Sequence, residues 1–363
     1  MLIPPLSDYR AARARFLSLA EGAGATVEHH PHPRTGPDGE PLATDVARLG
    51  AAPGEAGAVV VVASGTHGVE GHAGSGLQEL LLTVGRLGAL PPDTAVVLVH
   101  AVNPYGMAWS RRVDHDNIDV NRNFVDFTAP LPPIGRYADI DHLLNPSGHD
   151  LDLDDSSWQD ALWAFAAEAG MAEAFRAITG GQYERPAGMQ FGGSEESWSR
   201  TTLQTIWARH LSGARLVVNL DIHTGLGPCG GLTLFQTADA GEAAAEAGAR
   251  WFPQVLRSDR PETTDPLAYG GLGPGVDAAA DDAALSVPVV VEFGTLEDAV
   301  VLSAMRADNW LHAHGDPGSD LGQRIQARTR AAFFVDDESW RTSVADQGMA
   351  TIHAALDAAA ETA

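Results

Sequence analysis

The segment AVVVVASGTHGVEG, residues 58–71, carries the strongest indication of the fold in this 363-residue sequence. Its first part, Ala58–Ala63, is a continuous apolar run of the length of a buried β-strand. The run continues into a glycine-rich turn that contains His67 and Glu70. Because parallel sheets place ligands at the carboxyl ends of their strands, we expect these two side chains to lie at a functional edge of a sheet.

Apolar runs of the same kind recur along the chain and alternate with stretches of helical character. Further strands are predicted at Ala95–Val102, Leu216–Ile222, Leu232–Gln236 and Val287–Glu292. Helices are predicted at residues 7–22, Gly74–Leu87, Trp158–Glu168, Gly241–Phe252 and Ser343–Ala360. This alternation predicts an α/β fold with a largely parallel sheet that helices cover on both faces.

Two segments depart from this pattern. Residues 29–41, HHPHPRTGPDGEP, are rich in His, Pro and Gly, which favours a flexible surface loop over a metal-binding cluster. Residues 128–200 are rich in Pro, Gly, Asp and Trp, and we interpret them as an insertion over the active-site face. The chain is therefore predicted to form a single domain over residues 1–363 that includes this insertion.

The composition excludes several classes of function. The net charge of −25 would repel nucleic acid and anionic membranes, so neither is an expected partner. All 23 basic residues are Arg, which excludes a Schiff-base lysine, a P-loop lysine and an SxxK serine hydrolase. The single Cys229 excludes an internal disulfide and a Cys-based zinc ribbon, and a buried, inert thiol is expected there. The N-terminal residues lack the apolar core of a signal peptide, so a cytoplasmic location is expected.

A metal site is the first chemical hypothesis. His67 and Glu70 lie three residues apart, a spacing that lets both reach one ion, although HxxE is common by chance. His223, in the segment DIHTG, ends another apolar strand and shares a strand face with Asp221. A buried histidine there could also be an ordinary core residue. Two His and one Glu would leave a fourth position open for water, which is the pattern of a catalytic zinc.

Two further segments add groups suited to hydrolysis. The stretch RRVDHDNIDVNRNF, residues 111–124, offers four side chains that suit a carboxylate or a developing oxyanion, or that could form a salt-bridged surface loop: Arg111, Arg112, Asn121 and Arg122. Glu292 ends the otherwise apolar strand VPVVVEFGT. Because burial raises the pKa of a carboxyl group, Glu292 is a candidate general base.

In this order, the four segments resemble those of the zinc carboxypeptidase superfamily, which shares a clan with aspartoacylase and succinylglutamate desuccinylase. The resemblance is to a bacterial branch and extends over nearly the whole chain, from DYRAARARF through HAVNPYGMAW to EFGT. It implies a mixed, mainly parallel sheet between helices. It also implies one Zn²⁺ per chain, held by His67, Glu70 and His223.

The resemblance further assigns roles around the metal. Asn121 and Arg122 would grip a free carboxylate of the substrate, and Arg112, or in second place Arg111, would polarise the scissile carbonyl. Asp119 would orient His67, with Asp221 as a second outer carboxylate, and Glu292 would act as general base. Tyr269 is the candidate for the family's mobile tyrosine, or else a packing residue.

The implied activity is hydrolysis of an amide bond next to a free carboxylate. The substrate would be either the C-terminal residue of a peptide or a small N-acylated amino acid. An alternative of another class is a non-catalytic binding module that kept the fold. A serine hydrolase is disfavoured because Ser75 lacks the GxSxG spacing. His312 and His314 could form a second metal site, but a surface role is expected for them. The oligomeric state is not indicated.

Overall fold

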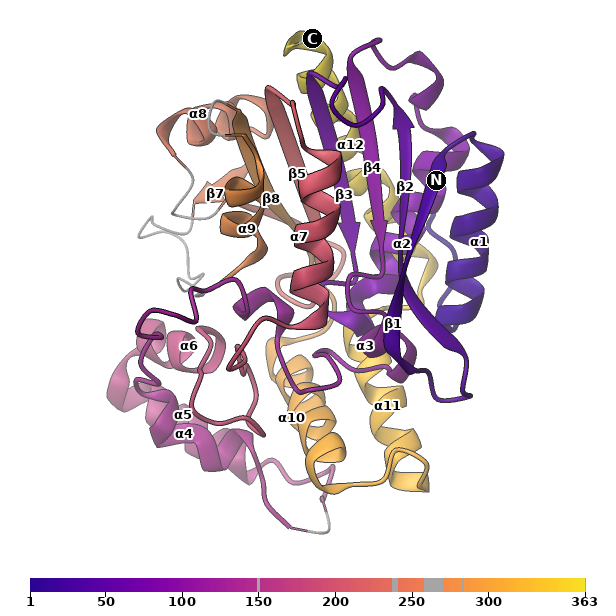
Figure 1. Ribbon diagram of the computed structural model, residues 1–363. Coiled ribbons are helices and arrows are strands. Elements are labelled where there is room, and N and C mark those ends of the chain that lie inside the picture. Colours follow the sequence, from indigo (N-terminus) through magenta and orange to yellow (C-terminus); the bar gives the residue numbers. More distant parts are fainter. Residues whose placement is uncertain (149–150, 237–240, 258–269, 282–283, 363) are drawn as a thin grey trace.

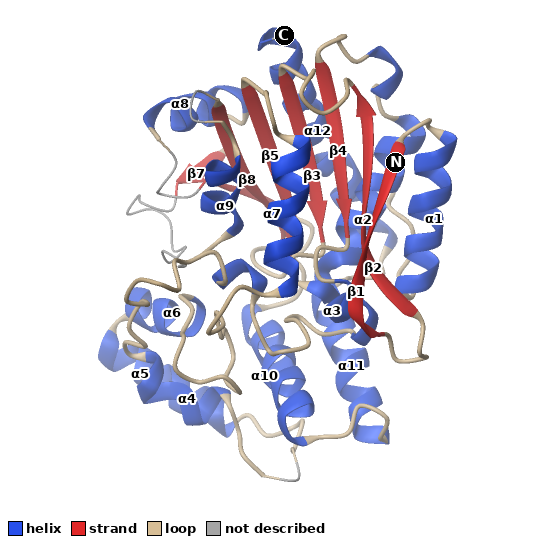
Figure 2. Ribbon diagram, in the orientation of Figure 1, coloured by secondary structure: helices blue, strands red, loops and turns tan. Residues whose placement is uncertain are grey.

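A mixed β-sheet forms the centre of the protein, for which a computed structural model describes residues 1–148, 151–236, 241–257, 270–281 and 284–362. Within these residues eight strands follow the order β1-β2-β4-β3-β5-β8-β6-β7 (Figures 1 and 2). Their bounds are β1 Thr26–Thr35, β2 Pro41–Gly50, β3 Ala58–Ser64, β4 Thr94–His100, β5 Leu216–Thr224, β6 Leu232–Gln236, β7 Val255–Arg257 and β8 Leu285–Phe293. The central strands β4, β3, β5 and β8 are parallel, whereas β2 and β6 join them antiparallel. The predicted α/β class with a mixed, mainly parallel sheet is confirmed.

Helices cover both faces of this sheet. One face carries α1 (Tyr9–Gly22), α2 (Gly71–Val84), α8 (Glu242–Trp251) and α12 (Glu338–Thr362), and the other carries α7 (Trp198–His210) and α9 (Leu272–Ala279). Successive side chains of β3 point to opposite faces. Val60 therefore packs in the first apolar core, while Val61 packs in the second. Burial on both faces explains why β3 is apolar at every position up to its last residue.

The remaining helices lie at the carboxyl ends of the parallel strands, in the lower part of Figure 1. They are α3 (Pro104–Trp109), α4 (Tyr137–Leu144), α5 (Ser157–Ala169), α6 (Met171–Thr179), α10 (Asp298–His314) and α11 (Asp320–Phe333). Three short 3₁₀ turns complete the described structure: Gly68–Glu70, Leu87–Ala89 and Val120–Arg122. Helices α4 to α6 pack on one another around a cluster of their own, and Leu302 and Met305 of α10 pack against it. Residues 128–200 thus contribute a helical layer beside the carboxyl edge of the sheet.

Most predicted elements are confirmed, with ends that differ by a few residues, but three expectations were wrong. The expected loop over residues 29–41 is largely strand β1, which pairs antiparallel with β2. Its prolines are tolerated because β1 is an edge strand, where a missing N–H costs little. Cys229 is exposed rather than buried. The side chain of His312 is buried against Asp308 rather than on the surface, while His314 is exposed, as expected.

Among the described residues, no helix combines the length and apolar character that a membrane span requires.

Candidate metal centre and active site

The turn after β3 is fixed by backbone contacts. The N–H of Gly68 donates to the carbonyl of Arg112 at 3.0 Å, and the N–H of Val69 donates to that of Arg111 at 3.0 Å. A Cβ on Gly68 would lie 2.1 Å from the backbone of Gly106, so only glycine fits there. This close approach ties the turn with His67 to the loop that carries the arginines.

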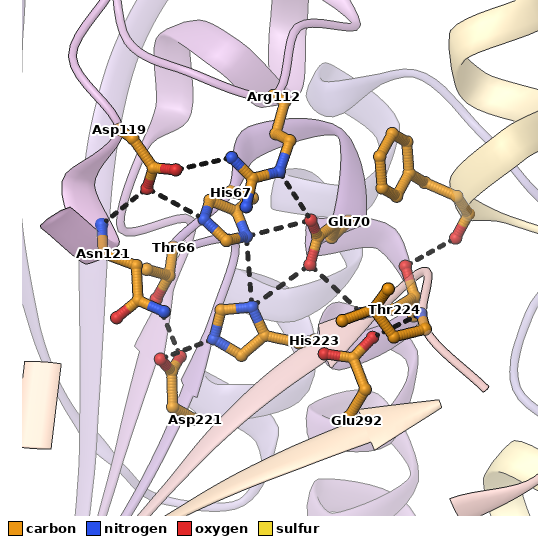
Figure 3. A network of polar contacts seen from close by, with 12 residues as sticks. Thr66, His67, Glu70, Arg112, Asp119, Asn121, Asp221, His223, Thr224 and Glu292 are labelled. Atoms are coloured by element: carbon orange, nitrogen blue, oxygen red, sulfur yellow. Dashed lines mark hydrogen bonds and ion pairs between the residues drawn. The ribbon is translucent and has the colours of Figure 1, made fainter. Parts of the chain in front are cut away.

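Three buried side chains converge just beyond the strand ends (Figure 3). Nδ1 of His67 lies 2.9 Å from Oε1 of Glu70, and Nδ1 of His223, at the end of β5, lies 3.2 Å from Oε2 of Glu70. The two Nδ1 atoms are themselves 3.2 Å apart. The structure thus brings His67, Glu70 and His223 together, and they could hold a metal ion.

Two outer carboxylates decide which ring nitrogens face this centre. Nε2 of His67 lies 3.0 Å from Asp119, and Nε2 of His223 lies 2.7 Å from Asp221. Because an ionised carboxylate only accepts hydrogen bonds, each Nε2 carries a hydrogen, so each ring turns its Nδ1 inward, where it can offer a lone pair to a metal ion. Two facing lone pairs beside a carboxylate fit a divalent cation.

The charge balance of the centre agrees with this fit. Burial alone would lower the pKa of His223, but the carboxylates of Asp221 and Glu70 outweigh it and raise this pKa well above its usual value. Burial alone would raise the pKa of Glu70, but His67 and His223 hold it below its usual value. A positive charge is therefore stabilised at this point, and either a proton or a metal ion can supply it.

Arg112 lies beside the centre and is held by two carboxylates. One of its terminal nitrogens donates to Asp119 at 2.6 Å, and its Nε lies 3.6 Å from Glu70. The same terminal nitrogen also donates to Gln190 at 3.3 Å. Burial would raise the pKa of Asp119, but Arg112 and His67 keep it well below its usual value. The guanidinium is thus fixed with its charge beside Glu70.

Glu292 reaches the same place from the neighbouring strand. It pairs in register with His223, because β8 runs parallel to β5. Its Oε1 accepts the N–H of Leu226 at 3.0 Å. Burial, and then the charge of Glu70, raise the pKa of Glu292 to about 8. A group with such a pKa can both accept and donate a proton near neutrality.

The other predicted residues divide into three groups. Asn121 and Arg122 line the cavity in front of the centre, and Arg122 also donates to the carbonyls of Asn121 and Thr179. Arg111 is not among the described residues of that cavity. Its guanidinium points away from it and donates to the carbonyl of Asp114 at 2.9 Å and to the side chain of Asn117. Tyr269 lies outside the described residues.

The cavity itself has a volume of about 560 Å³. Its polar end holds the residues described above. Much of the remainder is a wall of α5, α6 and α10 residues that the sequence did not single out: Trp158, Leu162, Trp163, Phe175, Ile178, Leu302 and Met305. The clustering of Trp and helical fragments in residues 128–200 was the only sequence signal for this wall.

A model of the DUF2817 family, described as proteins of unknown function, matches residues 6–347. The chain belongs to this family. None of the curated proteins compared with the chain matches it.

Solved structures similar to the chain include three from different organisms. Carboxypeptidase A from Helicoverpa armigera is 13% identical, with 90% of this chain and 74% of that chain covered and a TM-score of 0.48. An aspartoacylase family protein from Mesorhizobium loti is 16% identical, with 80% and 67% covered and a TM-score of 0.39. The ectoine utilization protein EutE from Ruegeria pomeroyi is 12% identical, with 79% and 67% covered and a TM-score of 0.38.

Proposed function

We propose that this protein is a zinc-dependent hydrolase that cleaves an amide bond next to a free carboxylate. One observation carries the proposal: two ring nitrogens and a carboxylate converge at 2.9–3.2 Å in a cavity that also contains Glu292 and Arg112. His67, Glu70 and His223 would hold one Zn²⁺. Bound zinc supplies a Lewis acid that polarises a carbonyl and makes water more acidic.

The protein's own residues divide the remaining tasks. Glu292 takes a proton from the attacking water and passes it to the nitrogen of the leaving amine as the carbon–nitrogen bond breaks. Arg112, fixed by Asp119, donates to the carbonyl oxygen while negative charge develops on it. Arg122 and Asn121 hold the free carboxylate of the substrate. The products are an amine and a carboxylic acid.

Two substrates remain within this chemistry, a peptide's C-terminal residue and a small N-acylated amino acid. The side chains that α5 and α6 contribute to the cavity are mainly apolar, so they offer the backbone of an incoming polypeptide few hydrogen-bond partners. We therefore favour a small N-acyl amino acid, with one free carboxylate and no further peptide chain. Hydrolysis rates for peptides of graded length against N-acyl amino acids separate the two.

The first experiment combines metal analysis with one substitution. Purified protein is expected to hold one equivalent of zinc. Glu292→Gln is expected to keep that zinc and to lower kcat by about 10²–10⁴-fold, because only the proton transfer is lost. The matched control, Glu55→Gln on an exposed loop, should behave as the parent.

The possible failures of this experiment point to different errors. Near-full activity of Glu292→Gln with zinc bound would show that another group is the base. Protein without zinc and without hydrolytic activity would instead favour the non-catalytic binding module.

A further inference from the structure

The proposed chemistry uses only one end of the cavity. Much of the remaining wall comes from α5, α6 and α10 and consists mainly of large apolar side chains, among them Trp158, Leu162, Phe175, Ile178 and Leu302. Small polar substrates would leave this surface uncovered. An apolar wall that is continuous with a polar site indicates a ligand with both characters.

Burial along this wall changes from the inside to the mouth of the cavity. Leu162, Ala166 and Ala174 are buried where α5 and α6 pack together. Trp163 and Met171 also line the cavity, but each is 61% exposed. Large apolar side chains left in solvent beside a cavity are typical of binding surfaces. The apolar wall therefore runs from the site out to solvent without a closed end.

Charge is divided along the same direction. Among the described lining residues, the charged and metal-binding groups gather at the polar end, around Arg112, Arg122 and Glu292. On the apolar side, Asp298 at the start of α10 is the one charged residue within the described lining. A long substrate group that carries charge would find no counter-ion among these side chains, whereas a hydrocarbon chain would find apolar contacts along the wall.

We propose that the apolar wall binds the hydrocarbon chain of a medium- or long-chain acyl group. This inference rests on the proposed function and names its substrate class: N-acyl amino acids with fatty acyl chains, rather than acetyl or succinyl derivatives. A fatty acyl chain fits a wall with an open outer end, because the chain can extend along it to Trp163 and Met171. The free carboxylate of the same substrate would lie at Arg122.

The test compares N-acetylglycine, N-octanoylglycine and N-dodecanoylglycine as substrates of the zinc-loaded enzyme. The value of kcat/KM is expected to rise with chain length, by at most about fourfold for each buried methylene. Trp163→Ala is expected to lower the dodecanoyl-to-acetyl ratio of kcat/KM by about tenfold, with a smaller loss for Met171→Ala. Because both residues are exposed, these variants should fold. The matched control is Val84→Ala at the end of α2, which is 52% exposed and is not among the lining residues of the cavity.

A binding measurement separates this inference from the proposed function. Calorimetry with the Glu292→Gln variant should show N-dodecanoylglycine binding more tightly than N-acetylglycine, and Trp163→Ala in that background should remove the difference. If this holds but no substrate is hydrolysed by the parent, the acyl site stands and the proposed reaction fails. Equal kcat/KM or equal affinity for all chain lengths overturns the acyl site while the reaction stands. A Trp163→Ala variant that changes the oligomeric state, with the chain-length ratio unchanged, also overturns it and assigns the exposed patch to a contact between copies.

Discussion

Asp119 and Asp221 each accept a hydrogen bond from the Nε2 atom of a histidine ring, but their other hydrogen-bond partners differ. Asp119 accepts from three donors: Nε2 of His67 at 3.0 Å, the backbone N–H of Asn121 at 3.0 Å and the guanidinium of Arg112 at 2.6 Å. None of these three groups can turn around and accept a hydrogen bond in the charge state that the site requires.

Of the two hydrogen-bond partners that Asp221 has among the described residues, only one is a donor that cannot also accept. It accepts from Nε2 of His223 at 2.7 Å, and its other oxygen accepts from the hydroxyl of Thr66 at 2.7 Å. A hydroxyl can rotate and become an acceptor. An asparagine at this position can therefore accept from His223 and donate to Thr66, so the hydrogen bonds remain and only the charge is lost.

We predict that Asp119→Asn destabilises the metal-free protein much more than Asp221→Asn. In Asp119→Asn the new amide group faces the guanidinium of Arg112, which breaks a buried ion pair and costs about 3 kcal/mol of unfolding free energy. In Asp221→Asn a charge-assisted hydrogen bond becomes a neutral one, which costs about 1 kcal/mol. Both variants should bind zinc about 10–100-fold more weakly, because the ring opposite each carboxylate loses its orienting charge.

Two assays measure these quantities separately. Urea unfolding of metal-free protein gives the free energy of unfolding, and competition with a chromophoric chelator gives the zinc affinity. Asp357→Asn is the matched control, since its carboxylate forms an exposed ion pair with Arg86 and should change stability by less than about 0.5 kcal/mol. Equal losses of stability for Asp119→Asn and Asp221→Asn would refute the reasoning from hydrogen-bond partners. Unchanged zinc affinity in both would refute the assignment of the ligand rings.

Three further predictions concern stability. Gly68→Ala should cost about 3 kcal/mol of unfolding free energy in urea, because its Cβ would meet the backbone of Gly106, whereas Gly88→Ala, with open space around it, should change stability by less than about 1 kcal/mol. Burial raises the pKa of Asp308 to about 6, so the stability that its protonated form contributes is complete below pH ~4 and is lost as the pH rises through about 6. Asp308→Asn cannot ionise, so its unfolding free energy relative to the parent should rise by about 2 kcal/mol between pH 4 and pH 7; a constant difference would contradict this. Zinc at a free concentration of about 100 times its Kd should raise the unfolding free energy by about 2.7 kcal/mol, and His223→Ala should abolish this increase.

The sequence by itself determined the fold class and the residue types of the site. The apolar run of β3 predicted a strand buried on both faces, and the structure has it in the middle of the sheet. Strand ends that carry His67, Glu70, His223 and Glu292 predicted a common edge, because parallel strands bring their carboxyl ends together. Both inferences depend on local pattern and on the chemistry of single residues, which a sequence displays directly.

Only the tertiary structure decided which of several similar residues face the site. Arg111 and Arg112 are adjacent in sequence, but the backbone contacts of this loop turn Arg112 toward Asp119 and Arg111 toward the loop itself. The edge strand β1 was also invisible, because its His- and Pro-rich composition is that of a loop until its pairing with β2 is known.

The apolar wall of the cavity shows the same limit. Trp163 and Leu302 are 139 positions apart in sequence, and no periodicity connects them. They line one cavity because α5, α6 and α10 pack together at the carboxyl edge of the sheet. Residue chemistry and local spacing are properties of the chain, whereas the direction of a side chain and its distant neighbours arise only when the elements pack.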